Sequence, residues 1–256
     1  MTTWLAPAAI IAGLLGAWEL AARLDVITNA LNLEPFLVPA PSQIVEALWQ
    51  DRGLLADDAW VTIQEVLAGF ALSVVVGVGF AIVLHLWPSL RRAVYPLLVA
   101  SQTVPIVVVA PILVVWLGFG IGPKLAIIAL ICFFPITVNT LDGLGSVDPA
   151  LLKMMRTLDA SRWQTLRRVE GPTALPYFFS GAKIAVAVAV IGAVFGEWAG
   201  SSSGLGHLIQ EASAQLQTAR TFAAVAVLSG LAIALFAVLA ALERRVAWWG
   251  TDGGRV

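Results

Sequence analysis

Charged side chains are scarce in this sequence. Asp, Glu, Lys and Arg make up 12% of its 256 residues, while 59% are hydrophobic. Soluble proteins carry about 25% charged residues, so the polar groups here are too few to cover a water-soluble globule. The composition therefore predicts a single membrane domain, residues 1–256, whose surface is largely in contact with lipid.

Residues that hold metals, disulfides and phosphates are also few. Cys132 is the sole cysteine, so no intrachain disulfide can form, and His85 and His207 lie too far apart in the chain to suggest a metal site. No glycine-rich loop precedes a Lys-Ser or Lys-Thr pair. We therefore predict no catalytic residues, no metal and no cofactor, and any ATP that the protein uses must bind to another chain. A net charge of −1 gives no indication of a nucleic-acid partner.

Six apolar stretches are long enough to cross a bilayer as helices of about 20 residues. The first lacks the positive flank of a cleaved signal peptide and is interpreted as a retained helix. The sequence thus predicts an all-α membrane protein, with spans at about residues 4–24, 61–87, 93–117, 124–141, 177–198 and 221–242.

The basic residues between the spans are unevenly distributed. Ten of them, from Arg91 to Arg255, fall on one side of the membrane, and three or four fall on the other, including Arg52, Lys124 and Arg220. Basic loops remain in the cytoplasm. The bias therefore predicts that both termini and the polar segment 142–176 are cytoplasmic.

Prolines interrupt several of the apolar stretches. Pro105, Pro111 and Pro135 lie within predicted spans. Proline removes a helix hydrogen bond, and membrane helices tolerate the loss where a neighbour or a cavity satisfies the exposed groups. These prolines indicate either structural kinks or a broken helix beside a pathway, and Gln102 and Thr103 just before Pro105 favour the pathway.

Glu65, Lys183 and Glu197 are the candidates among the ionisable residues that lie within predicted spans. Charges inside a bilayer are costly and usually face protein or water. Glu65 and Lys183 lie near span ends, so we expect their side chains to extend toward the headgroups. Glu197, followed by Trp198 at the outer end of the fifth span, either faces a substrate or forms an interfacial pair.

Segment 142–176 is the one long polar stretch of the chain. It predicts a helix over 149–158 and a second short helix that Ser161 caps and that Gly171-Pro172 ends. Its basic residues indicate either a loop held by anionic lipid or a docking element for another protein.

The stretch from Leu151 to Lys183, LLKMMRTLDASRWQTLRRVEGPTALPYFFSGAK, resembles the EAA-type loop of permease subunits of bacterial binding-protein-dependent ABC importers. The likeness extends along most of the chain, through VPAPS at 38–42, SQTVPIVVVAP at 101–111, WLGFG at 116–120 and SGLG at 203–206. The pieces SRWQ at 161–164, VE at 169–170 and ALP at 174–176 look like the branch that imports sulfonates, nitrate, and pyrimidine or flavin precursors. Two positions depart from the pattern, because Asp159 stands where glycine is usual and Lys153 near where an acidic residue is usual.

The resemblance implies a type I importer permease in the bacterial inner membrane. It would act with ATP-binding ATPase subunits, an extracytoplasmic substrate-binding protein and a second permease subunit, identical or closely related. The resemblance assigns ATPase coupling to Asp159, Ala160, Ser161, Arg162, Trp163, Leu166, Arg167, Glu170 and Gly171. A translocation path is suggested at Gln102, Thr103, Pro105, Asn139, Glu197 and Trp198.

The substrate is expected to be a small heterocycle, such as a thiamine-pyrimidine or riboflavin precursor, because FGEW at 195–198 and QLQT at 215–218 look like that subgroup. Glu197 and Trp198 would offer it a hydrogen-bond acceptor and a stacking face. An importer of alkanesulfonate, taurine or nitrate is the alternative. A secondary transporter, an intramembrane enzyme and a structural subunit are less well supported, because the halves show no convincing repeat and the spans hold no catalytic set.

Overall fold

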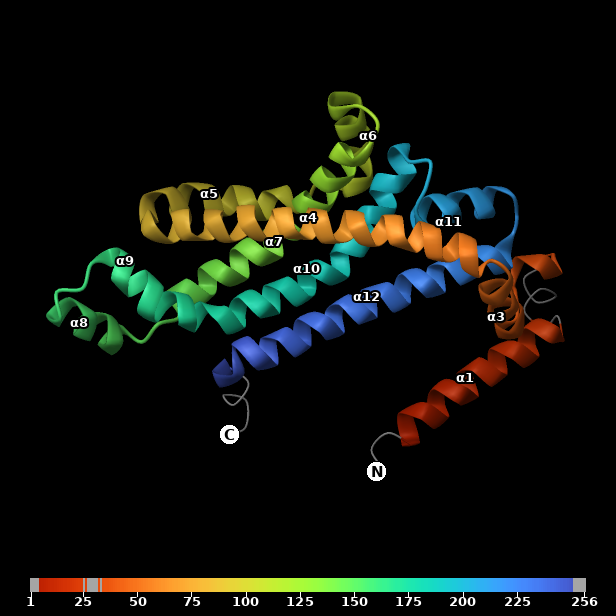
Figure 1. Ribbon diagram of the computed structural model, residues 1–256, viewed down its shortest axis with the longest axis horizontal. Coiled ribbons are helices and arrows are strands. Elements are labelled where there is room, and N and C mark those ends of the chain that lie inside the picture. The colour runs from red at the N-terminus through yellow and green to blue at the C-terminus, as the bar shows by residue number, and fades with distance from the viewer. Residues whose placement is uncertain (1–4, 25, 27–31, 33, 251–256) are drawn as a thin grey trace. The chain divides into compact units, whose positions relative to one another are not determined.

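The computed structural model describes residues 5–250 apart from 25, 27–31 and 33, and these residues form helices and connecting turns (Figure 1). The predicted all-α class is therefore confirmed. Trp4, at the start of the predicted first span, and Arg255, in the basic tail, lie outside the described residues. The longer helices are α1 (Leu5–Arg23), α3 (Pro41–Gln50), α4 (Arg52–Leu86), α5 (Pro88–Ser101), α6 (Ile106–Leu117), α7 (Ile121–Gly145), α8 (Pro149–Thr157), α10 (Gly171–Gly200), α11 (Leu205–Ala214) and α12 (Thr218–Val246). The short elements are η1 (Pro35–Leu37), α9 (Arg162–Thr165), η2 (Leu166–Glu170) and η3 (Trp248–Gly250).

Four helical stretches of the described chain are long and apolar enough to cross a membrane: α4, α7, α12 and the run Arg162–Gly200. A fifth results if α5 and α6, bent by 100° at their break, count as one span. The predicted interruption at Pro105 thus lies at a sharp break, whereas Pro111 and Pro135 lie inside continuous helices. Helix α1 occupies the position of the predicted first span but is not among these candidate spans. The predicted number of six spans is therefore not confirmed.

The contacts divide the chain into two compact units, Met1–Val61 with Ser202–Ser229, and Thr62–Ser201 with Gly230–Val256. Helices α4 and α12 each contribute to both units. The candidate functional residues discussed below lie mainly in the second unit.

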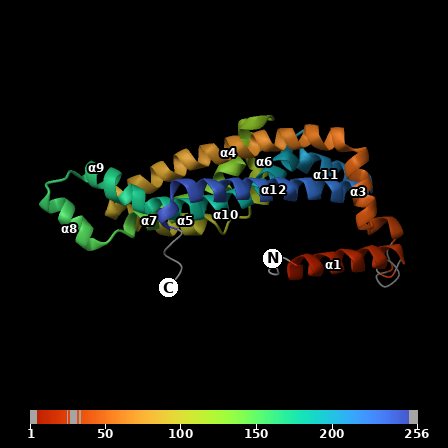
Figure 2. The same cartoon turned by 60° about the horizontal axis from the view of Figure 1, so that its bottom comes forward.

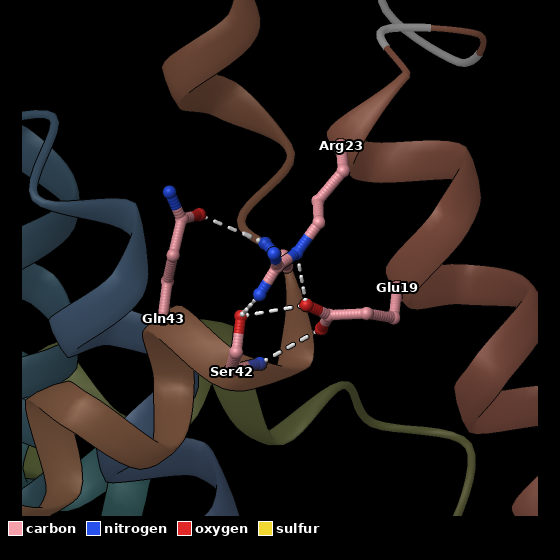
Figure 3. Close-up of polar contacts among 5 residues, drawn as sticks. Glu19, Arg23, Ser42 and Gln43 are labelled. Atoms are coloured by element: carbon pink, nitrogen blue, oxygen red, sulfur yellow. Dashed lines mark hydrogen bonds and ion pairs between the residues drawn. The ribbon is translucent and has the colours of Figure 1, made fainter.

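The first unit contains a polar contact that fixes the start of α3 (Figure 3). The Glu19 carboxylate accepts hydrogen bonds from the Ser42 amide at 2.9 Å and from the Ser42 hydroxyl at 2.7 Å. Arg23 pairs with Glu19 and donates to Ser42 Oγ at 3.2 Å. Since the N-terminus of a helix favours a negative charge, Glu19 of α1 stabilises the proline-rich entry to α3.

The second unit is built on the packing of α7 against α10, the most extensive helix pairing in the described chain (Figures 1 and 2). The two backbones approach closely, because a Cβ atom added at Gly181 would lie 2.5 Å from the Pro135 carbonyl oxygen. Asn139 Nδ2 donates to that same oxygen at 2.7 Å. Small residues at the contact permit the close approach that stabilises helix pairs in lipid.

Candidate coupling segment and buried polar cluster

The polar segment is an ordered pair of short helices rather than an irregular loop. Asp148 caps α8 by accepting from the Ala150 amide at 2.8 Å. At the other end Asp159 has φ of +51°, and the amides of Asp159 and Ala160 donate to the carbonyls of Arg156 and Met155, both at 3.0 Å. This is a Schellman termination, which needs a left-handed residue and usually takes glycine. Aspartate tolerates that conformation better than most residues.

The second short helix starts at the predicted cap. Ser161 Oγ accepts from the Gln164 amide at 3.2 Å, and Gln164 Oε1 accepts from the Ser161 amide at 2.8 Å. These reciprocal bonds form a capping box. The prediction that Ser161 is an N-cap is therefore confirmed.

The prediction that Gly171-Pro172 ends this helix is wrong. The chain stays helical from Arg162 to Gly200 through the π-helical turn η2. The Gly171 amide bonds the Leu166 carbonyl, five residues earlier, and a Cβ atom at Gly171 would lie 3.0 Å from that oxygen. The wide turn thus accommodates a proline that lacks an amide hydrogen, and the polar segment is continuous with α10.

Two polar contacts attach this continuous helix to the end of α4. Arg162 Nη1 donates to the Leu86 carbonyl at 3.2 Å, one of the carbonyls that a helix end leaves without an internal partner. His85 Nε2 lies 3.1 Å from Glu170 Oε2. Leu166 is buried in a cluster with Leu144 and Ala174. Of the residues predicted to couple to an ATPase, Arg162, Leu166 and Glu170 thus contact the permease itself.

Other side chains of the segment are exposed. Trp163 is 65% exposed, and Arg167 beside the buried Leu166 is also exposed. Leu151, Met154 and Leu158 of α8 and its C-cap are exposed as well. Sequence reasoning missed these three, although their i, i+3, i+7 spacing marks one helix face. Leu151, Met154, Leu158 and Trp163 are called the exposed apolar set below.

The residues suggested for a translocation path do not form one site. Gln102, Thr103 and Pro105 lie exposed at the break between α5 and α6, where Thr103 Oγ1 donates to the Ala100 carbonyl at 2.8 Å. Asn139 instead bonds within α7, as described above. The Thr103 hydroxyl therefore satisfies a carbonyl at the C-terminal end of α5.

A buried polar cluster links α4, α7 and α10 in the second unit. Lys124 Nζ lies 2.5 Å from Glu65 Oε1 and donates to Ser201 Oγ at 2.6 Å. Thr62 Oγ1 donates to Glu197 Oε1 at 2.7 Å. Glu65, Lys124 and Glu197 are 3%, 7% and 1% exposed.

The cluster corrects the expectation for the ionisable residues. Glu65 does not extend toward the headgroups but pairs with Lys124, which sequence reasoning counted as a loop residue. Lys183 likewise pairs with Glu243 of α12 at 2.7 Å. The Glu197 carboxylate is buried rather than offered at a surface, while Trp198 packs edge-on against Phe195, with ring centroids 5.6 Å apart. The acidic residues Glu65 and Glu197 within the apolar spans were the sequence signal that could have indicated a buried basic partner, Lys124.

The motif QLQT at 215–218 closes helix α11 in the first unit. Leu216 has φ of +60°, and the amides of Leu216 and Gln217 donate to the carbonyls of Ser213 and Ala212 at 3.1 and 2.8 Å. These bonds give the motif a structural role at the end of a helix.

Within the described part of the chain, no group of three or more His, Cys, Asp or Glu side chains is placed to hold a metal ion. The apolar helices, the structured polar segment and the buried ion pairs together define a multi-pass α-helical membrane protein. Residues 69–248 match the family of binding-protein-dependent transport system inner membrane components. The chain belongs to this family and is the membrane-spanning permease subunit of an ABC importer.

Two relatives illustrate the membership. The formylaminopyrimidine transport permease ThiX of Halalkalibacterium halodurans is 39% identical, over 91% of this chain and 90% of its own length. The riboflavin transport system permease RibX of Chloroflexus aurantiacus is 36% identical, over 84% and 81%. Permeases named for aliphatic sulfonate and taurine transport also match, at 30% and 29% identity.

A solved structure of the MetNI methionine ABC transporter in an inward-facing conformation shares the fold. It matches 77% of this chain and 98% of its own with a TM-score of 0.69 and 18% sequence identity. The likeness confirms the predicted type I importer permease fold.

Proposed function

We propose that residues 151–171 dock onto an ABC ATPase subunit and transmit its nucleotide-driven movement to the spans. The exposed apolar set carries this proposal, because apolar side chains on an otherwise polar segment are typical of the centre of a protein interface. Basic residues around the set, including Lys153, Arg156 and Arg167, would form a polar rim. Trp163 is the natural anchor, since tryptophan is enriched among interface hot spots.

The local structure supports a mechanical link between this segment and the membrane. The helix continues without a break from Arg162 into α10, and Arg162 and Glu170 attach it to the end of α4. A displacement of the docked segment would therefore move α10 and α4 together. Such rigid-body movement, biased by nucleotide, is the basis of alternating access.

The same proposal implies an orientation of the chain in the membrane and a set of partner subunits. The positive-inside bias would place the segment and both termini in the cytoplasm, where the ATPase subunits bind ATP. A second permease subunit would complete the path, and an extracytoplasmic binding protein would deliver substrate from the other side.

Site-directed cross-linking tests the docking. Cys132 is fully buried, so single cysteines added at the surface can be labelled selectively with a short photoactivatable reagent. Leu158→Cys should cross-link to the ATPase in the assembled transporter. Val75→Cys, on the exposed face of α4, is the control and should not. Intact transporter in which Leu158→Cys gives no cross-link would refute the docking surface.

We propose further that the substrate is a small heterocycle such as a pyrimidine or flavin precursor. The names of the two relatives quoted above support this class, since both concern heterocycles. Alkanesulfonate or taurine is the second candidate, supported by less similar relatives. The burial of Glu197 removes it as a surface acceptor for either substrate.

Uptake into proteoliposomes distinguishes the two classes. The complete transporter with its binding protein should accumulate labelled formylaminopyrimidine or riboflavin in an ATP-dependent manner, and excess taurine should not compete. ATP-dependent uptake of taurine or an alkanesulfonate, with none of the heterocycles, would overturn the substrate proposal while leaving the permease assignment intact.

A further inference from the structure

The helix that joins the coupling segment to α10 has a weak point at the π-helical turn η2. There the Gly171 amide bonds the Leu166 carbonyl, five residues earlier. Pro172, the next residue, has no amide hydrogen to donate to the preceding turn. Helices kink most sharply at such turns and at prolines. Bending at η2 would therefore absorb a displacement of the docked segment before it reached α10.

The end of α4 holds both ends of this weak stretch. Arg162, at the start of the continuous helix, donates to the Leu86 carbonyl at 3.2 Å. Glu170, the last residue of η2, lies against the preceding residue of α4, with 3.1 Å between Glu170 Oε2 and His85 Nε2. These two interactions are called the α4 contacts below. Because they attach both ends of the stretch to consecutive residues of one helix, they oppose bending at η2.

Only one of the α4 contacts has a strength that depends on pH near neutrality. The side chains of His85 and Glu170 are 17% and 13% exposed, so solvent screens their interaction less than it would at the surface. A charged imidazole makes a charge-assisted bond to a carboxylate, about twice as strong as a neutral bond. Histidine side chains change charge between about pH 5 and 8, whereas arginine stays charged throughout this range.

The charged groups that surround His85 do not change their charge in this range. A hollow of about 150 Å³ lies around the contact, and its other charged lining residues are Arg156 of α8, Arg162 of α9 and Glu170 of η2. Arg91 of α5, the helix after α4, pairs with Asp142 of α7 at 3.7 Å. Among the described residues that line the hollow, Glu170 is the one carboxylate and His85 the one group that titrates near neutral pH.

We propose that His85 is a positioning residue for ATP coupling, which holds Glu170 and so makes α4 and α10 move with the coupling segment. The inference rests on the proposed docking of residues 151–171 and adds a regulation to it. With a charged imidazole, η2 stays straight and the docked segment moves both spans. With a neutral imidazole, η2 bends more often and ATP is hydrolysed without transport. Coupling is therefore strongest near pH 6 and weakens toward pH 8.

The ratio of substrate taken up to ATP hydrolysed tests the proposal in proteoliposomes of the complete transporter. Both rates are measured in the same vesicles, with equal pH on the two sides, between pH 6 and 8. The probe is labelled formylaminopyrimidine, riboflavin or taurine, whichever the wild type accumulates. The wild-type ratio should fall roughly fivefold over this range, as expected when a charge-assisted hydrogen bond becomes a neutral one. A ratio that does not change with pH would overturn the proposal.

Three variants locate the effect. His85→Gln keeps a hydrogen-bond donor for Glu170 but carries no charge, so its ratio should be low at every pH in the range. His85→Lys stays charged up to pH 8, so its ratio should not fall. His207→Gln is the matched control, because His207 lies 4.0 Å from Glu211 in the first unit, outside the coupling segment, and its pH profile should equal that of the wild type. A wild-type profile in His85→Gln, a fall in His85→Lys or a lost profile in His207→Gln would overturn the proposal.

The affinity for the ATPase separates failure of this inference from failure of docking. His85→Gln should bind the ATPase with the wild-type Kd, because the exposed apolar set lies outside the hollow around His85. A raised Kd for His85→Gln would show that His85 supports docking, and would overturn its role in coupling. If docking through the segment fails instead, Trp163→Ala keeps the wild-type Kd, whatever the pH profile of the His85 variants.

Discussion

Replacing Lys124 by methionine tests whether the buried polar cluster is as interdependent as its geometry indicates. Lys124 provides the positive charge within 2.5 Å of Glu65 and a hydrogen bond to Ser201. Methionine has a similar length but leaves the Glu65 carboxylate buried and unpaired. Breaking a buried ion pair by removing one partner costs about 3–5 kcal/mol.

The expected loss is large enough to measure in detergent. A change of 1 kcal/mol shifts Tm by about 2–4 °C in chains of 150–250 residues, so Lys124→Met should lower the apparent Tm by roughly 10 °C. Glu65→Gln should cost less, because it removes a charge while Lys124 keeps its hydrogen bond to Ser201. Circular dichroism or size-exclusion chromatography after heating would report both variants.

Lys183→Met supplies the matched control, because the Lys183–Glu243 pair is closer to the surface, with side chains 24% and 14% exposed. Its effect should be smaller than that of Lys124→Met, since solvent screens the charge that remains. A Tm for Lys124→Met within about 2 °C of the wild type, which is less than 1 kcal/mol on the same scale, would refute the reasoning. A larger loss for Glu65→Gln than for Lys124→Met would do the same.

Two further predictions concern the backbone; the first is checked by the same thermal assay and the second by limited proteolysis. Gly181→Ala should destabilise the protein by about 1–3 kcal/mol, because the new Cβ would lie 2.5 Å from the Pro135 carbonyl oxygen. The control Gly79→Ala, whose Cβ would have nothing within 4 Å, should be neutral or stabilising by up to about 1 kcal/mol. Equal effects of the two variants on stability would contradict the close packing of α7 and α10. Asp159→Gly should leave α8 intact or firmer, and Asp159→Val should loosen it by about 1–2 kcal/mol, because a β-branched residue resists the left-handed conformation. If α8 is equally protected from proteolysis in both variants, the left-handed helix termination at Asp159 would be contradicted.

The helical class and the approximate positions of the spans could be predicted from the sequence, because apolar length alone decides which segments cross a bilayer. Ser161 and Asp159 were also informative, since caps and left-handed terminations depend on local residue chemistry. The continuation through Gly171-Pro172 could not be predicted in this way. It depends on a π-turn that lets the helix accommodate a proline. In the sequence, a Gly-Pro pair fits the end of a helix equally well.

The candidate sites depended more strongly on tertiary structure. Lys124 and Glu65 are 59 positions apart, so their pairing follows from the packing of α7 on α4 and not from spacing. The segment residues Trp163 and Leu166 look similar in sequence, but one is exposed and the other is buried against Leu144. Which of them can meet a partner follows from the face that packs on the bundle.

The most direct test of the central claim is the affinity between this permease and its ATPase, measured with Trp163→Ala. The ATPase that co-purifies with the tagged wild-type chain is isolated and titrated onto permease variants in nanodiscs. Loss of a hot-spot tryptophan costs 2 kcal/mol or more, so Kd should rise about 30-fold or more. Trp116→Ala is the control, because Trp116 is 76% exposed in α6, outside the coupling segment, and its Kd should equal that of the wild type. An unchanged Kd for a folded Trp163→Ala protein, or an equal rise in both variants, would contradict coupling through this segment.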